Sequence, residues 1–145
     1  MNQNKIILIE DNQDDITLTL KALKSNNILN EIVVLSDGAE ALDYCFCRGK
    51  YSDNILEDLN ISVILLDLKL PKVDGIEILR TLRKSDKYKS QPIVILTSSL
   101  DECDIVKSYN LGANSFIQKP VDLNNFFKTV KELGMYWLLL NKPMP

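Results

Sequence analysis

Several short apolar runs in this sequence are followed by side chains that could take part in phosphoryl or metal chemistry. Glu10 and Asp11 follow one of these runs, and Asp67 follows another. Thr97 follows a third, and Lys119 comes shortly after a fourth. A pair of acids alone is weak support for a site. Three acids together with a hydroxyl and an ammonium form a set with a shared chemistry.

The chemistry that suits this set is Mg²⁺-assisted phosphoryl transfer. Crowded carboxylates repel one another, and Mg²⁺ relieves that repulsion because it prefers carboxylate oxygen and water and shares its other positions with phosphate oxygens. The ammonium and the hydroxyl can neutralise a phosphoryl group in transfer. One carboxylate must then be the nucleophile, and Asp67 is the best candidate because it follows the most apolar run. Glu10 and Asp11 would hold the metal.

Each residue also has an ordinary structural interpretation. Glu10 and Asp11 could cap a helix, as acids in this position often do. Thr97 could simply end a strand, and Lys119 could be a solvated lysine before a turn. Singly, these interpretations are at least as good as the functional one. Their coincidence at the ends of four apolar runs favours a site.

The apolar runs have the length and composition of buried β-strands. They are rich in Ile and Val and apolar at successive positions, which indicates strands covered on both faces in a parallel sheet. The carboxyl ends of parallel strands meet at one edge, where ligands bind in such folds. We expect strands at residues 6–9, 32–35, 63–66, 93–96 and, more weakly, 115–117.

Segments with helical periodicity lie between these runs. Apolar side chains recur at helical spacing over residues 16–23, 76–82 and 123–133, with Asp122 at the N-cap position of the last segment. A second helix fits residues 36–47 and a short fourth one fits residues 102–109. Five repeats of strand then helix predict a doubly wound α/β domain. Residues 49–60 contain Gly, Ser, Asp and Asn, and this composition predicts a surface loop that is somewhat longer than usual.

The composition fits one globular domain. The chain has 145 residues, 46% hydrophobic and 26% charged, with a net charge of −3. No basic stripe suggests nucleic acid, and no signal peptide or membrane-spanning run is visible, so we expect a cytoplasmic protein. Cys45, Cys47 and Cys103, in a chain without His, favour a reducing compartment over disulfides or a zinc site.

The order and spacing of the motifs resemble the response regulator receiver family over nearly the whole chain. The matching stretches are residues 7–12, 64–71 with Asp74-Gly75, 93–98 and 116–120. The resemblance implies a flavodoxin-like, five-stranded parallel sheet of order 2-1-3-4-5 with five helices. It also implies that residues 1–145 form a single receiver domain.

The resemblance implies a metal site around a phosphoacceptor. Asp67 would accept the phosphoryl group from a sensor histidine kinase. Glu10 and Asp11 would bind Mg²⁺ together with Asp67 and the backbone carbonyl of Lys69. The protein would be a signalling switch of a two-component system, catalysing only its own phosphorylation and dephosphorylation.

The resemblance also implies a switch. Thr97 and Lys119 would contact the phosphoryl oxygens, and Phe116 stands at the switch-aromatic position of the family. Thr97 and Phe116 would move together on phosphorylation, although the ring of Phe116 has no hydroxyl with which to gain a hydrogen bond. Plain core packing is the alternative for Phe116.

A narrower resemblance is to the stand-alone regulators associated with bacterial phytochrome histidine kinases. It rests on the long loop before the third strand, on residues 107–109, and on residues 119–123 running on to Trp137. Members of that group are often homodimers. Lys69 departs from the group, which more often has Asn two residues after the phosphoacceptor; its cation could pair with a phosphoryl oxygen or with Glu10.

The segment after the last predicted helix is apolar on every side. A helical extension at about residues 134–142 could bury only one stripe against the domain, and the exposed remainder predicts a binding surface. We expect a homodimer contact through the last helix and this tail; folding back on its own domain is the alternative. Because the chain stops at Pro145, we expect no output domain.

Other functions fit parts of the pattern. A phosphatase of the haloacid dehalogenase type has a second Asp two positions after the nucleophile, where this chain has Lys69. A flavin or nucleotide site has a Gly-rich or Ser/Thr-rich loop after the first strand, where this chain is acidic. A receiver fold that binds proteins without phosphorylation, or a phosphorelay intermediate, remains open.

Overall fold

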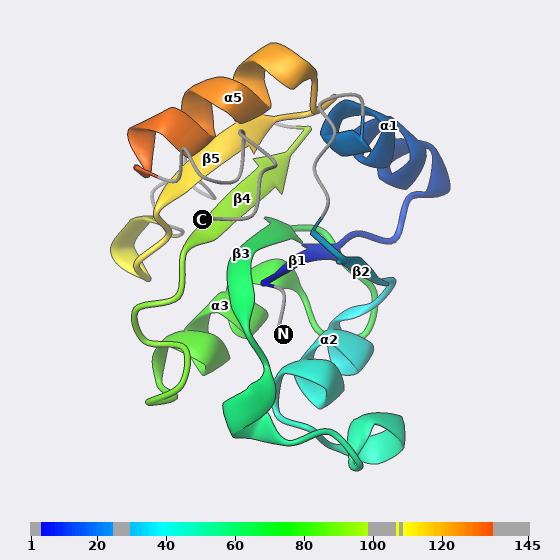
Figure 1. Cartoon of the computed structure of the whole chain (residues 1–145), viewed down its shortest axis with the longest axis vertical. Helices are drawn as coiled ribbons and strands as arrows, with labels where there is room; N and C mark the ends of the chain where they lie inside the picture. Colours follow the sequence, from blue (N-terminus) through cyan, green and yellow to red (C-terminus); the bar gives the residue numbers. More distant parts are fainter. Residues whose placement is uncertain (1–3, 25–29, 99–106, 108, 135–145) are drawn as a thin grey trace, which may run out of the picture.

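A five-stranded sheet with helices on both sides makes up the described part of the chain (Figure 1). The computed structural model describes residues 4–24, 30–98, 107 and 109–134. Its strands are β1 (Lys5–Ile9), β2 (Ile32–Leu35), β3 (Ile61–Asp67), β4 (Ile93–Thr97) and β5 (Ser115–Gln118). Its α-helices are α1 (Gln13–Lys24), α2 (Gly38–Cys45), α3 (Gly75–Arg83) and α5 (Leu123–Glu132).

The strands are all parallel and lie in the order β2-β1-β3-β4-β5. The predicted doubly wound sheet of this order is therefore confirmed. Ile9 at the end of β1 aligns with Leu66 of β3, and Asp67 aligns with Leu96 of β4. The carboxyl ends of these strands consequently lie side by side at one edge.

The pleat of the sheet divides the apolar side chains of each strand between two cores. In β1, Ile6 and Leu8 belong to the core under α1 and α5, whereas Ile7 and Ile9 belong to the core under α2 and α3. All four of these side chains are fully buried. The two pairs of helices cover opposite sides of the sheet (Figure 1). Burial on both faces is why the runs are apolar at successive positions.

Side-chain caps set the beginnings of three helices. Asp37, Asp74 and Asp122 each accept a hydrogen bond from the backbone N–H three residues further on, before α2, α3 and α5. Asp122 and Asn125 bond each other's backbone N–H in a complete capping box. The predicted cap at Asp122 is confirmed.

Some predicted boundaries differ from the structure. The second helix was expected over residues 36–47, but it begins at Gly38 because Asp37 takes the cap, and it ends at Cys45. The predicted loop at residues 49–60 contains two short 3₁₀ helices, Gly49–Tyr51 and Leu56–Asp58. The helix expected at 102–109 and the extension at 134–142 fall almost wholly outside the described residues.

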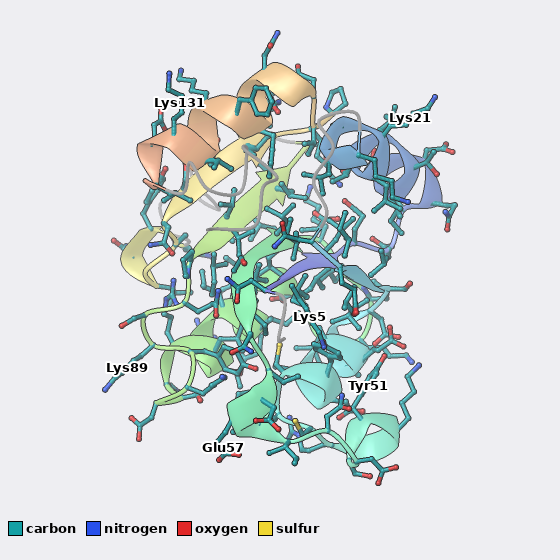
Figure 2. All side chains as sticks on the ribbon, viewed as in Figure 1. Lys5, Lys21, Tyr51, Glu57, Lys89 and Lys131 are labelled. Carbon is teal, nitrogen blue, oxygen red and sulfur yellow. The ribbon has the colours of Figure 1, made fainter. Side chains whose placement is uncertain are left out.

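Lysines near the ends of two helices face solvent. Lys21 on α1 and Lys131 on α5 lie in the last turns of their helices and point away from the sheet (Figure 2); positive charge is favourable there. None of the described helices is long and apolar enough to cross a bilayer. The thiols of Cys45 and Cys47 are free, the first buried and the second half-buried.

Gly75 allows the first turn of α3 to pack directly against the residues that follow β3. A Cβ atom there would lie 2.4 Å from the carbonyl oxygen of Asp67 and 2.6 Å from the Cα of Leu68. Its N–H donates to the carbonyl of Leu68 at 2.9 Å. The absence of a side chain at Gly75 is thus what lets α3 brace the segment that carries Asp67.

Replacing Gly75 with Ala should destabilise the fold, because the contacting atoms are backbone and cannot move away cheaply. We expect the free energy of unfolding to fall by about 2–3 kcal/mol for Gly75→Ala. Gly134→Ala is the control: its φ is 72°, but no atom lies within 4 Å of the place that a Cβ would take, so only backbone strain of about 1 kcal/mol applies. Urea unfolding measures both; equal losses would contradict the packing account.

Candidate functional site

The carboxyl ends of four strands bring the predicted residues to one edge of the sheet. Glu10 follows β1, Asp67 ends β3, Thr97 ends β4, and Lys119 follows β5. Glu10, Asp67 and Thr97 are 0%, 5% and 4% exposed. Asp11, next to Glu10, is exposed to solvent. The convergence expected from a parallel sheet is therefore present.

Three carboxylates form the acidic side of this site. Glu10, Asp11 and Asp67 each offer an oxygen, and these oxygens all lie within 4.8 Å of one another. Two of the three side chains are buried and the third faces solvent. A cluster of hard oxygen ligands that is partly open to water suits Mg²⁺ or a similar divalent cation. The residues present thus fit a metal of this kind.

The ammonium of Lys119 forms the basic side. Its Nζ lies 2.9 Å from Glu10 Oε1, 2.9 Å from Asp15 Oδ2 and 3.2 Å from Asp67 Oδ2. The Lys119 side chain is only 7% exposed. An ammonium has three N–H donors, so each donor has one carboxylate. Lys119 is fixed at the point where the acidic side chains meet.

The burial of these charges changes their pKa values. Burial, and then a hydrogen bond with Asp67, raises the pKa of Glu10 to about 7, against the opposing effect of Lys119. For Lys119, burial lowers the pKa, but the hydrogen bonds to Asp15 and Glu10 outweigh burial and raise it. Lys119 therefore stays cationic, and one ammonium does not fully compensate the acids around it. A divalent cation would supply the missing positive charge.

Backbone groups hold the site side chains in place. Asp67 Oδ1 accepts the N–H of Lys69 at 3.2 Å, and Glu10 Oε2 accepts the N–H of Asn12 at 3.2 Å. The N–H of Lys119 donates to the carbonyl of Thr97 at 2.7 Å, next to a cis peptide between Lys119 and Pro120. The site is thus built into the strand ends and does not depend on a long loop.

Two predicted residues lie at the margin of this group. The side chain of Lys69 is exposed, and the nearest cation to Glu10 in an ion pair is Lys119, so the pairing of Lys69 with Glu10 is not observed. Phe116 is half-buried on β5, and its ring meets that of Tyr109 edge-on, with centroids 5.8 Å apart. Phe116 also packs against the core under α2 and α3.

Sequence reasoning missed Asp15, and the alternative interpretation of Glu10 and Asp11 as a helix cap does not hold for α1. Asn12, not Glu10 or Asp11, caps this helix: its Oδ1 accepts the N–H of Asp15 at 2.9 Å. Asp15 then reaches Lys119 from the first helical turn. No local pattern distinguishes Asp15 from an ordinary acid in a first helical turn, which is stabilising by itself.

The chain belongs to the response regulator receiver domain family. The model of that family, described as "Response regulator receiver domain", matches residues 6–131. The protein is thus a regulator of two-component signalling and not a conventional enzyme.

Its relatives include response regulators, and a solved structure among them is named for bacteriophytochrome. Response regulator Rcp1 of Synechocystis sp. is 36% identical over 133 residues, covering 92% of this chain and 88% of Rcp1. The solved structure of the bacteriophytochrome response regulator AtBRR is 48% identical, with a TM-score of 0.85 and coverage of 98% of this chain and 100% of AtBRR.

Two further solved structures are described with a metal or a phosphoryl group. One is the Mn²⁺-bound form of Rcp1, with a TM-score of 0.76, 34% identity and coverage of 98% of this chain and 99% of that one. The other is the phosphorylated cyanobacterial phytochrome response regulator RcpA, with a TM-score of 0.78, 37% identity and coverage of 97% of each chain.

Replacing Lys119 with Met should leave Glu10 and Asp67 buried without a cation. We expect the free energy of unfolding to fall by about 3 kcal/mol in the absence of divalent cations, and Mg²⁺ to restore more stability to this variant than to the parent. Lys89→Met is the control, because the Lys89–Asp86 pair is 3.9 Å long and exposed, and should change stability by less than about 0.5 kcal/mol. Chemical unfolding with and without Mg²⁺ measures both. A Lys119 variant as stable as the control would refute the role of this ion pair.

Proposed function

We propose that this chain is a phosphorylation-dependent switch that accepts a phosphoryl group from a sensor histidine kinase onto Asp67. The observation that carries the proposal is the placement of the buried Asp67 carboxylate between the ammonium of Lys119, 3.2 Å away, and the acidic group with Glu10 and Asp11. A carboxylate in this setting has both a cation for a phosphoryl oxygen and ligands for a metal beside it.

The proposed step is a single displacement at phosphorus. A carboxylate oxygen of Asp67 forms a bond to the phosphorus, and the bond from phosphorus to the donor atom breaks, its electron pair leaving with the donor. Lys119 donates a hydrogen bond to a phosphoryl oxygen, and the hydroxyl of Thr97 donates to another. The N–H of Lys69, which donates to Asp67 Oδ1, holds the carboxylate in orientation.

The proposed metal site consists of Glu10, Asp11, Asp67 and the backbone carbonyl of Lys69, with Mg²⁺ as the ion. When bound, Mg²⁺ offsets the negative charge that gathers on the phosphoryl oxygens during transfer. The Mn²⁺-bound form of Rcp1 supports a divalent ion in this family. The raised pKa of Glu10 supports the view that the acids need further positive charge.

The phosphoacceptor assignment predicts one covalent adduct. Incubation of the full chain with acetyl phosphate and Mg²⁺ should add a single phosphoryl group, as measured by intact-mass analysis. Asp67→Asn should abolish the adduct because the amide is a poor nucleophile, and chelation of the metal should suppress it in the parent.

An adduct that persists in Asp67→Asn would overturn the assignment. If the parent forms no adduct and binds no metal, the alternative of a phosphorylation-independent binding module is favoured. If it forms no adduct although the metal binds, a strict need for the kinase is favoured, and a purified phosphohistidine donor becomes the next test.

We further propose that phosphorylation acts through Thr97 and Phe116 on protein contacts. Phe116 is half-buried against Tyr109, so its ring can change burial when Thr97 moves. The proposed readout is a homodimer contact through α5 and the tail at about residues 134–142. The names of AtBRR and RcpA support a phytochrome-like kinase as partner. Membership of the receiver domain family supports a cytoplasmic place of action. Onward relay of the phosphoryl group is an alternative to direct output.

The switch predicts that phosphorylation changes the assembly state. Sedimentation velocity on the full chain should show a different fraction of dimer with acetyl phosphate and Mg²⁺ than without, since the phosphoryl group stabilises one of two states. Asp67→Asn should show no such difference. Equal sedimentation and equal partner binding of the two forms of the parent would contradict the switch.

A further inference from the structure

One carboxylate on the ammonium of Lys119 comes from outside the strand ends. Asp15 lies in the first turn of α1, and its Oδ2 is 2.9 Å from Lys119 Nζ, as close as Glu10 and closer than Asp67. The Asp15 side chain is 26% exposed, whereas those of Glu10 and Asp67 are 0% and 7% exposed. Asp15 thus binds Lys119 from the solvent side of the site.

Asp15 is held in this place by the same residue that holds Glu10. The side-chain oxygen of Asn12 accepts the N–H of Asp15 at 2.9 Å, and the N–H of Asn12 donates to Glu10 Oε2 at 3.2 Å. The carbonyl of Asn12 accepts the N–H of Ile16 at 2.9 Å, and Ile16 is buried in the core. Asp15 is therefore anchored through the helix cap and the core, unlike an ordinary surface acid.

We propose that Asp15 is a positioning residue for phosphoryl transfer: it holds the Lys119 ammonium so that the N–H now facing Asp67 is presented to the phosphoryl group. The inference rests on the proposed function. The lysine side chain is a flexible four-carbon chain that ends in a freely rotating ammonium. More than one hydrogen-bond partner is therefore needed to hold the ammonium in a single orientation.

The three carboxylates that contact Lys119 have different roles in the proposed reaction, and Asp15 is the one suited to position the ammonium. During transfer, the Asp67 oxygens share their charge with the phosphoryl group, so the bond from Lys119 to Asp67 is the one to be exchanged. Glu10 belongs to the acidic group that fits a metal, and Asp15 does not. Asp15 is accordingly the partner whose charge stays available to Lys119 throughout.

A purely structural explanation exists for Asp15, since an acid in the first turn of a helix is stabilising. Asp14 lies in the same turn of α1 and is exposed, whereas the ion pairs of Lys119 within the described residues involve Glu10, Asp15 and Asp67. Asp14→Asn removes the same charge from the same turn without touching Lys119. It is the matched control for Asp15→Asn.

The test compares the parent with Asp14→Asn, Asp15→Asn and Asp15→Glu as full chains. Intact-mass analysis gives the initial rate of phosphorylation at saturating Mg²⁺ and acetyl phosphate, and calorimetry gives the Mg²⁺ affinity without the donor.

We expect Asp15→Asn to slow phosphorylation about fivefold or more, because the ammonium of Lys119 is misplaced. Asp14→Asn should stay within about twofold of the parent, as expected for a charge that acts only at long range. The two Asn variants should bind Mg²⁺ equally, and Asp15→Glu should restore part of the rate.

A second readout needs neither metal nor donor. The ¹³Cε resonance of Lys119 in the metal-free protein reports the surroundings of the ammonium. It should shift in Asp15→Asn and remain unchanged in Asp14→Asn, because Asp15 forms an ion pair with Lys119 and Asp14 does not.

Each other outcome overturns the inference. Equal rates of phosphorylation in the two Asn variants would show that Asp15 acts only as a favourable charge at the helix end. A higher rate in Asp15→Asn than in the parent would show that Asp15 hinders the movement of Lys119. A loss of Mg²⁺ affinity in Asp15→Asn that matches its loss of rate would place its action on the metal. If the parent forms no adduct with acetyl phosphate and none with a purified phosphohistidine donor, the proposed function fails, and the inference fails with it. If the parent reacts normally and only the Asp15 variants depart from expectation, the failure concerns Asp15 alone.

Discussion

Glu10, Asp15 and Asp67 meet at one edge of the sheet, and the ammonium of Lys119 is the positive charge that allows them to do so. Buried charges are stable only when they are paired and hydrogen-bonded. Each N–H of the Lys119 ammonium has one carboxylate, at 2.9, 2.9 and 3.2 Å. That arrangement links α1, β1, β3 and β5 at this edge, because each contributes or precedes one of the four groups.

The strand order determines which kind of side chain can serve at each place. β1 and β3 are neighbours in the sheet, so the short carboxyl side chain of Asp67 and that of Glu10 can approach each other directly. β5 is separated from β3 by β4, a distance of about 10 Å between strands. A long side chain such as Lys119 can span that gap, and the hydrogen bond from its N–H to Thr97 aims it across β4. The residue types in the site are thus matched to the topology.

The sheet and the strand-end residues could be predicted from the sequence because both depend on short-range patterns. Apolar runs covered on both faces have a strong signal, and parallel strands place their carboxyl ends together. Asp15 could not be predicted in this way. An acid in a first helical turn already has a sufficient local explanation, and its partner Lys119 is 104 positions away in sequence. The beginning of α2 was missed although its signal is local: Asp37 accepts the N–H of Glu40 three residues on, in the same way as the correctly predicted cap Asp122 accepts that of Asn125.

The acidic side chains around Lys119 make the folded state less stable than a fully compensated cluster would, and the hydrogen bonds of Lys119 can be exchanged as a result. The pKa of Glu10 is raised to about 7 because burial and Asp67 disfavour its charged form, which means that the acids are not fully compensated in the protein alone. A fully compensated cluster would hold Lys119 too firmly for a phosphoryl group to compete for its N–H donors. A site with no compensation would lose about 3 kcal/mol or more of stability. An intermediate balance, in which one ammonium pairs with three carboxylates, is compatible with the divalent cation and the phosphoryl group that we propose for this site. Stability of this kind is commonly sacrificed at functional sites.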